Sequence, residues 1–182
     1  MRIGIIGQVT LTHKSQMIFA KLGQQIYPLR QMEELAYLDG LWISSCQAQI
    51  LKDLQHWRQP LQKQTHLAIM GAALGAVALG QNGGLAMMDY QARYKEAIHQ
   101  TAELLRIPSW NDHKLTAVFG PEIYFEQIAP NLGILCQTAE RGPIILRQGN
   151  FLAASFIPEE SPDQSIYHYF LEMVRRSRKR NS

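Results

Sequence analysis

Few side chains in this sequence are of the kinds that could carry covalent chemistry, and they are scattered along the chain. Cys46 and Cys136 are the two residues that could supply a thiol nucleophile. The six histidines, at positions 13, 56, 66, 99, 113 and 168, fit no metal-ligand spacing with one another or with cysteine. The sequence contains neither the phosphate-binding G-x-x-x-x-G-K-[ST] loop nor the G-x-S-x-G turn of serine hydrolases. We therefore expect no metal and no cofactor.

Cys46 is the cysteine whose position suits a nucleophile. It follows a predicted strand at 41–44, where its side chain could face a pocket at the end of a sheet. No histidine lies beside it in the sequence to take its proton, and free cysteine is more often a small buried hydrophobe. Cys136 falls in the middle of another predicted strand, so we expect it in the core. Two cysteines are too few for a disulfide framework, which favours a reduced, cytoplasmic setting.

The first half of the chain predicts a parallel sheet that would position these groups. Short apolar segments there are typical of buried strands, and each is followed by a segment with helical spacing or a run of small residues. Strands that alternate with helices in this way form parallel sheets with helices on both faces. The predicted strands are 2–6, 25–29, 41–44 and 66–70, and the segments between and after them are 12–22, 31–38, 47–57 and the Gly/Ala-rich run 71–80.

The second half predicts short strands joined by tight turns, as in an antiparallel region. Glu140-Arg141-Gly142 and Gln148-Gly149-Asn150 have the composition of such turns. Residues 90–107 fit both a helix and a strand. Ser161-Pro162-Asp163 is typical of a helix start, and apolar residues at helical spacing follow it. The predicted strands are 115–119, 124–128, 134–137, 144–147 and 151–156, and no linker or repeat divides the chain, so we expect one domain over 1–182.

Charge is unevenly distributed along the chain, whose net charge is +3. Five of the 18 basic residues lie within 175–180, and the remaining 13 face 15 acidic residues in the body. This balance is not typical of a nucleic-acid groove, and we expect 175–182 to be a frayed, solvated tail. The longest apolar run, 66–80, is too short to span a membrane, and the N-terminus has no signal-peptide pattern. These features predict a soluble, cytoplasmic protein that binds neither nucleic acid nor membranes.

The order of four segments resembles that of the class I glutamine amidotransferases, and most of all the glutaminase subunits of pyridoxal 5′-phosphate synthase. That family begins with M-[KR]-I-G-V-L, continues with D-G-L-I-[LI]-P-G-G-E-S-T, then G-T-C-A-G-L after a strand, and near its end Q-F-L-G-x-S-F-H-P-E. The resemblance implies a three-layer α/β/α, flavodoxin-like fold with a mainly parallel central sheet. The corresponding segments here are MRIGIIGQ at 1–8, LDGLWISSCQAQ at 38–49, HLAIMGAALGAVALG at 66–80 and NFLAASFIPEE at 150–160.

The resemblance also implies where a catalytic triad would stand, and the letters there differ from those of the family. In the family a cysteine attacks the glutamine side-chain amide, a histidine moves the proton and an acid orients the histidine. We place the cysteine position on Gly71 and the histidine position on Ile157, so that only the acid, Glu159, remains. The Gly-Gly of the oxyanion turn is replaced by Ser45-Cys46. Nucleophile, base and oxyanion turn are thus altered together.

Each surviving position also has a plainer interpretation. We expect Gly71 in a strained strand-to-helix turn, because glycine tolerates such a backbone; the alternative is that it allows a helix to pack closely on the sheet. Glu159 could be a solvated or capping acid before the last helix. The Gly/Ala run after Gly71 is more typical of tight helix–sheet packing than of a cofactor site.

Three functions remain open on this evidence. The first is a catalytically degenerate glutamine amidotransferase-like protein that acts by binding, with a synthase subunit of vitamin B6 biosynthesis or a second copy of itself as partner. The second is an active hydrolase or amidotransferase with relocated chemistry, in which Cys46 is the nucleophile. The third is a sensor that binds a small molecule at the carboxyl ends of the parallel strands.

Overall fold

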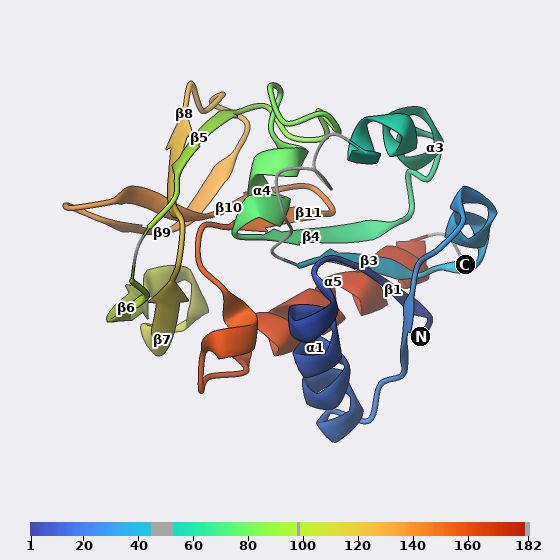
Figure 1. Cartoon of the computed structure of the whole chain (residues 1–182), viewed down its shortest axis with the longest axis horizontal. Coiled ribbons are helices and arrows are strands. Elements are labelled where there is room, and N and C mark those ends of the chain that lie inside the picture. Colours follow the sequence, from blue (N-terminus) through green and yellow to red (C-terminus); the bar gives the residue numbers. More distant parts are fainter. Residues whose placement is uncertain (45–52, 98, 181–182) are drawn as a thin grey trace.

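A seven-stranded sheet runs through the centre of the protein (Figure 1) in the computed structural model, which describes residues 1–44, 53–97 and 99–180. The strand order is β2-β1-β3-β4-β11-β10-β9. The five strands from β2 to β11 are parallel, and β10 and β9 are antiparallel to their neighbours. The predicted mainly parallel sheet is therefore confirmed. Its strands are β1 (Ile3–Ile6), β2 (Ile26–Pro28), β3 (Gly40–Ile43), β4 (Ala68–Ala72), β9 (Gly133–Thr138), β10 (Gly142–Gln148) and β11 (Phe151–Ala154).

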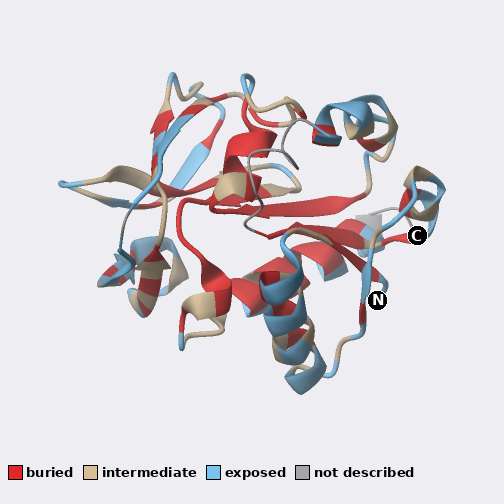
Figure 2. Cartoon of the chain, in the orientation of Figure 1, coloured by how far each residue is buried: buried red, intermediate tan, exposed pale blue. Residues whose placement is uncertain are grey.

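Helices cover both faces of this sheet and make it a three-layer structure (Figure 1). On one face, α1 (Val9–Lys21) and α5 (Ser165–Arg180) pack through apolar side chains such as Phe19 and Phe170 against inward residues of the sheet. On the other face lie α3 (Arg58–Gln62) and α4 (Leu74–Leu79), together with a second apolar cluster. The central strands are buried on both sides (Figure 2), which is why β3 and β4 consist of apolar residues and glycine without polar alternation.

Two further antiparallel sheets, each of two strands, lie on the β10–β9 side of the central sheet (Figure 1). One pairs β5 (Gln91–Lys95) with β8 (Glu122–Glu126), and the other pairs β6 (Thr101–Ile107) with β7 (His113–Phe119). Within the ambiguous stretch 90–107, residues 91–95 and 101–107 are therefore strand, and the helical alternative is wrong for them. Along β6, Leu105 and Ile107 are buried whereas Leu104 and Arg106 are exposed, which is the period of two that a strand produces.

Short 3₁₀ segments lie within some of the remaining connections. They are η1 (Met32–Tyr37), η2 (Leu54–Trp57), η3 (Pro108–Trp110) and η4 (Pro158–Glu160). The segment 31–38, predicted as a short helix or a turn, is thus a 3₁₀ helix over Met32–Tyr37. The predicted helix at 47–57 is described only from residue 53 onward, and its last four residues, from Leu54, form η2. None of the described helices is long and apolar enough to cross a membrane.

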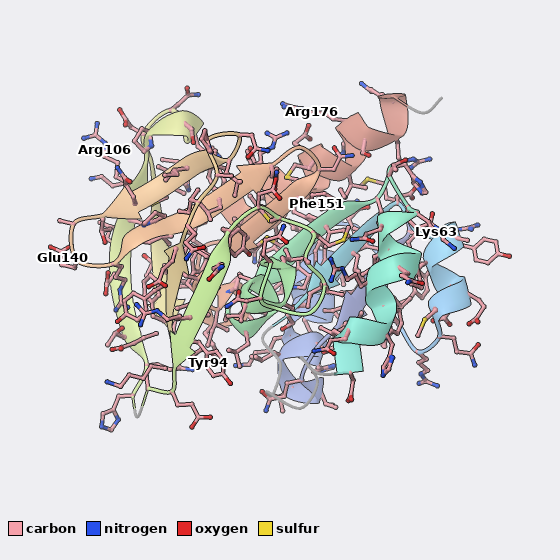
Figure 3. All side chains as sticks on the ribbon, turned by 90° about the horizontal axis from the view of Figure 1, so that it is seen from above. Lys63, Tyr94, Arg106, Glu140, Phe151 and Arg176 are labelled. Atoms are coloured by element: carbon pink, nitrogen blue, oxygen red, sulfur yellow. The ribbon has the colours of Figure 1, made fainter. Side chains whose placement is uncertain are left out.

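The basic C-terminal stretch continues α5 and is not frayed over 175–180, contrary to our expectation. The helix runs to Arg180, and Figure 3 shows Arg176 projecting from it near the chain end. Two contacts hold this last part of the helix to the body. The Ser177 hydroxyl donates to the carbonyl of His66, and the Arg178 guanidinium lies 3.4 Å from the Asp39 carboxylate. The basic side chains of 175–180 therefore lie at the end of an ordered helix, where the helix dipole favours cations.

Candidate active-site region

The carboxyl ends of β1, β3, β4 and β11 meet at one edge of the sheet, where open α/β folds place their ligands. Gly7 follows β1 and lies so close to β3 that a Cβ on it would come 2.7 Å from the Cβ of Ser44. The Ser44 hydroxyl is buried, with no hydrogen-bond partner among the described residues. Ser45 and Cys46, the predicted oxyanion-turn positions, lie outside the described residues, so the Cys46 alternative also stays a prediction.

The turn from β4 into α4 is strained at Ala73. This residue has φ 48° and ψ −118°, a combination that an L-amino acid other than glycine adopts only at a cost of ~1–3 kcal/mol. Its backbone N–H donates to the carbonyl of Ala154 on β11 at 2.8 Å, and its own carbonyl accepts the bond from Ala76 at 2.9 Å that opens α4. Ala73 is fully buried. The strained strand-to-helix turn therefore exists, and a methyl group occupies it.

Gly71 does not occupy this turn, so that part of our prediction is wrong. It lies inside β4, paired with Ile43 on one side and Ala153 on the other. A Cβ on Gly71 would come 2.5 Å from the Gly75 carbonyl oxygen and 2.7 Å from Leu79. Gly71 is therefore glycine because α4 packs closely on β4, which is the plainer of the two interpretations. The prediction failed because the sequence by itself does not distinguish a glycine inside a turn from a glycine two residues before it.

The register of the resembling motif agrees with this correction. When the first glycine of the family pattern G-T-C-A-G-L stands on Gly71, its second glycine falls on Gly75 and its cysteine falls on Ala73. Gly75 has a close contact of its own, because a Cβ there would collide with the carbonyl oxygen of Ile43. The two glycines four residues apart were the signal that could have located the turn from the sequence.

Replacing Ala73 with glycine is expected to leave stability unchanged or raise it by ~1 kcal/mol. Relief of the backbone strain offsets the lost methyl burial and the larger entropy of glycine in the unfolded chain. Ala78→Gly is the matched control, since Ala78 is equally buried within α4, and there we expect a loss of ~1–2 kcal/mol. Urea unfolding of both variants measures the difference, and equal losses would contradict the strained turn.

Ile157, the predicted base position, is buried as expected, with 5% of its surface exposed. Its backbone N–H donates to the carbonyl of Val118 at the end of β7, at 2.8 Å. Its side chain lies against Gly120, where an added Cβ would come 2.8 Å from the Ile157 Cδ1 atom. An isoleucine side chain can neither accept nor release a proton, so this position supplies packing and no acid–base chemistry.

Glu159, the predicted acid position, is 6% exposed and is not the solvated acid of the plainer interpretation. Its Oε1 atom accepts a hydrogen bond from the Ser15 hydroxyl at 2.9 Å and another from the Trp42 indole N–H at 3.0 Å. Its Oε2 atom is buried, with no hydrogen-bond partner among the described residues. Trp42 also stacks on Tyr167, with ring centroids 4.5 Å apart. The carboxylate therefore joins η4 to α1 and β3, and neither donor is a base that it could orient.

The negative charge of Glu159 affects the hydroxyl of the nearby Tyr167. Burial, and secondarily the nearby Glu159 carboxylate, raise the pKa of the Tyr167 hydroxyl far above its usual range. The neighbouring Glu160 pairs with Lys14 at 2.6 Å, so two consecutive acids hold α1. Sequence reasoning did not find Ser15 or Trp42 as partners, because a serine in a helix and a tryptophan in a strand carry no signal of a contact more than a hundred residues away.

Cys136 lies in the core, as predicted. Burial raises the pKa of its thiol to about 11, so the reactive thiolate is scarce at neutral pH. Its Sγ atom is 3.6 Å from the carbonyl oxygen of Arg106. Within the described part of the chain, no group of three histidine, cysteine, aspartate or glutamate side chains is arranged to hold a metal ion.

Comparisons with known proteins identify relatives by sequence and structures with the same fold. No family model matches the chain. Curated relatives include the pyridoxal 5′-phosphate synthase subunits PdxT of Fervidobacterium nodosum, 27% identical over 98% of this chain and 100% of the relative, and of Carboxydothermus hydrogenoformans, 25% identical over 96% and 98%. A solved glutamine amidotransferase superposes with a TM-score of 0.81 at 21% identity, covering 94% of this chain and 98% of its own. A structure from Thermoplasma acidophilum, described as a GMP synthase subunit, superposes with a TM-score of 0.76 at 16% identity, covering 100% and 97%. The fold is thus the flavodoxin-like α/β fold of the glutamine amidotransferases.

Proposed function

We propose that this relative of the PdxT subunits has lost glutamine hydrolysis and acts by binding a partner protein. The observation that carries the proposal is the strained turn between β4 and α4, which holds Ala73 where a nucleophile would stand. Strain of this kind persists only where the surrounding structure imposes it, and at active sites it serves to present a side chain. Here the presented group is the methyl of Ala73, so in this proposal the strained turn has been kept while the nucleophile has been lost.

The other two triad positions support the same proposal. Ile157 cannot act as a base, and Glu159 is engaged by Ser15 and Trp42. Removing the members of a triad leaves at most the weak contribution of binding and oxyanion contacts. In this proposal Ala73 takes the nucleophile position that we first placed on Gly71, while Ile157 and Glu159 keep their assignments as relic base and acid.

The names of the relatives suggest the kind of partner. PdxT proteins are subunits of a pyridoxal 5′-phosphate synthase, and the structural neighbour from Thermoplasma is described as part of a GMP synthase. We therefore propose a cytoplasmic protein whose partner is a synthase subunit of vitamin B6 biosynthesis or, failing that, a second copy of this chain.

Purified protein is expected to release no ammonia from glutamine above the buffer background, both by itself and with a candidate synthase present. The physical reason is the absence of a nucleophile at residue 73 and of a base at residue 157. A coupled ammonia assay measures the rate, with the Fervidobacterium PdxT protein and its own synthase as the positive control. A turnover of about one per second or more, as in ordinary enzymes, would overturn the proposal.

Binding is tested separately by size-exclusion chromatography with light scattering. The chain is run alone and mixed with the synthase subunit from the same organism. A complex larger than either component supports the synthase partner, and a concentration-dependent dimer of the chain alone supports self-association. If the chain elutes as a monomer both alone and in the mixture, and the mass of the synthase peak does not rise, the proposed binding role is wrong.

Fewer observations support the two alternative functions than support the binding role. Relocated chemistry at Cys46 concerns a residue outside the described part of the chain, and the same ammonia assay on Cys46→Ser tests it. A role as a small-ligand sensor stays a prediction from the position of the strand ends.

A further inference from the structure

Strand β6 is an edge strand, because its sheet consists of β6 and β7 alone (Figure 1). The far edge of β7 is already occupied. Its Val118 carbonyl accepts the Ile157 N–H at 2.8 Å, and its Thr116 carbonyl accepts the Ser161 hydroxyl. The segment after β11 therefore covers β7, and the outer edge of β6 is the place where this sheet can gain another strand.

The two bonds to β7 also fix which backbone groups of β6 point outward. In an antiparallel pair, two residues that face each other either exchange both of their N–H···O bonds or direct these groups away from each other. Val118 directs its carbonyl away from β6, and its partner in the register is Ala102. The same holds for Thr116 and its partner Leu104. The N–H and C=O groups of Ala102 and Leu104 therefore point outward, and within the described part of the chain they have no hydrogen-bond partner.

The side chains of β6 do little to keep another strand away. Edge strands are usually guarded by unpaired charges, proline or bulges. Glu103 pairs with Arg141 at 2.6 Å. Arg106, labelled in Figure 3, pairs with Asp112 at 2.8 Å, so both charges of β6 are neutralised within the chain. β6 contains no proline, its register with β7 is unbroken, and Leu104 is 66% exposed.

We propose that two copies of this chain associate by pairing their β6 edges antiparallel, with Leu104 on the two-fold axis. In a two-fold dimer each contact is repeated with the copies exchanged, and outward-pointing groups must meet outward-pointing groups to form hydrogen bonds. Leu104 then lies opposite Leu104 of the other copy. Ala102 of each copy lies opposite Arg106 of the other, and Glu103 lies opposite Leu105.

Charge and backbone chemistry select this register over its two neighbours. A shift in one direction puts Glu103 on the axis, where two carboxylates would lie opposite each other, and like charges in that position are destabilising. A shift in the other direction puts Leu105 on the axis and Ala102 opposite Pro108, which has no N–H to donate. With Leu104 on the axis, no like charges of the two β6 strands lie opposite each other.

The contact consists of backbone groups and a few side chains, so it falls at the small end of protein interfaces. We therefore expect a Kd of ~10–100 μM. This association is the self-binding named in the proposed function, here assigned to a surface. It depends neither on the loss of glutamine hydrolysis nor on binding to a synthase.

Sedimentation velocity of the whole chain from about 5 to about 500 μM measures this association. Leu104→Lys and Leu104→Glu each place like charges opposite each other on the axis, and each should weaken the dimer by about tenfold or more. An equimolar mixture of the two variants should associate more strongly than either alone, because the introduced lysine then lies opposite the introduced glutamate. This rescue requires residue 104 to lie opposite itself.

Ile134→Lys is the matched control, because Ile134 is 45% exposed on β9, the edge strand of the central sheet, and we expect it to associate like the wild type. Hydrogen exchange of the wild type gives a readout that needs no variant. The Leu104 amide should gain protection as the concentration rises, whereas the Glu103 amide, which points toward β7, should not.

The proposal is overturned if the wild type stays monomeric over this range, if Leu104→Lys associates like the wild type, or if Ile134→Lys is the variant that dissociates. It is also overturned if the mixture associates no better than either variant alone, or if the Leu104 amide gains no protection. A chain that stays monomeric but binds the synthase subunit would contradict this proposal and leave the proposed function intact.

Discussion

Gly71→Cys is expected to destabilise the protein by ~3 kcal/mol or more, although the resemblance by itself would suggest that it restores a nucleophile. A Cβ at residue 71 would meet the backbone oxygen of Gly75 at 2.5 Å, and a backbone atom cannot move aside as the end of a side chain can. Overpacking of a tight core generally costs ~1–3 kcal/mol, and a collision with fixed backbone lies at the upper end or beyond. Urea unfolding monitored by circular dichroism measures the loss.

Ala73→Cys is the matched variant that separates the two registers. It introduces the same thiol two residues later, at a position that already carries a Cβ, so only one heavy atom is added. We expect a loss of ~1 kcal/mol. If Gly71→Cys is tolerated as well as Ala73→Cys, then α4 does not pack on β4 as described, and the assignment of residue 73 to the strained turn fails with it.

Glu159→Ala is expected to cost ~3 kcal/mol. The substitution leaves the Ser15 hydroxyl and the Trp42 indole N–H without their shared acceptor inside the core. Each buried donor that loses its partner costs ~1–3 kcal/mol, and the removed side chain also leaves a void beside Tyr167. Glu159→Gln keeps one carbonyl oxygen as an acceptor and removes the charge, so we expect it to lose ~1 kcal/mol or less.

The neighbouring acid provides the control for this prediction. Glu160 pairs with Lys14 through partly exposed side chains, so Glu160→Ala is expected to cost less than ~1 kcal/mol. Tryptophan fluorescence of the Glu159 variants, recorded with Trp57 and Trp110 replaced by phenylalanine so that Trp42 is the remaining indole, reports separately whether that indole has lost its partner. A Glu159→Ala variant as stable as Glu160→Ala would mean that the buried carboxylate is not the tie between η4 and α1.

These expectations rest on the proposal that the site has kept its backbone while its side chains have changed. Ala73 has a conformation that costs free energy for alanine, Ile157 is a buried hydrocarbon side chain at the proposed base position, and Glu159 is held by a serine and a tryptophan. Close packing explains why the backbone persists. Because Gly71 and Gly75 let α4 lie directly on β4 and β3, the turn between them has little room to relax, whatever side chain it carries.

The layers and the mainly parallel sheet could be predicted from the order of residues along the chain. Buried parallel strands must be apolar on both faces, and this requirement is visible in 2–6, 41–44 and 66–70 without any knowledge of their partners. Ile157 could likewise be identified as a position without acid–base chemistry, because that conclusion depends only on the residue type. Local patterns of this kind can be found within a few neighbouring residues.

The occupant of the strained turn and the role of Glu159 became visible only when the layers were packed together. A positive φ at Ala73 is imposed by the packing of α4 on the sheet and by the bond to Ala154, and alanine carries no local preference for it. The partners of Glu159 come from α1 and β3, 144 and 117 residues away. Contacts at such separations are set by how the layers pack, so a single sequence holds no local signal for them.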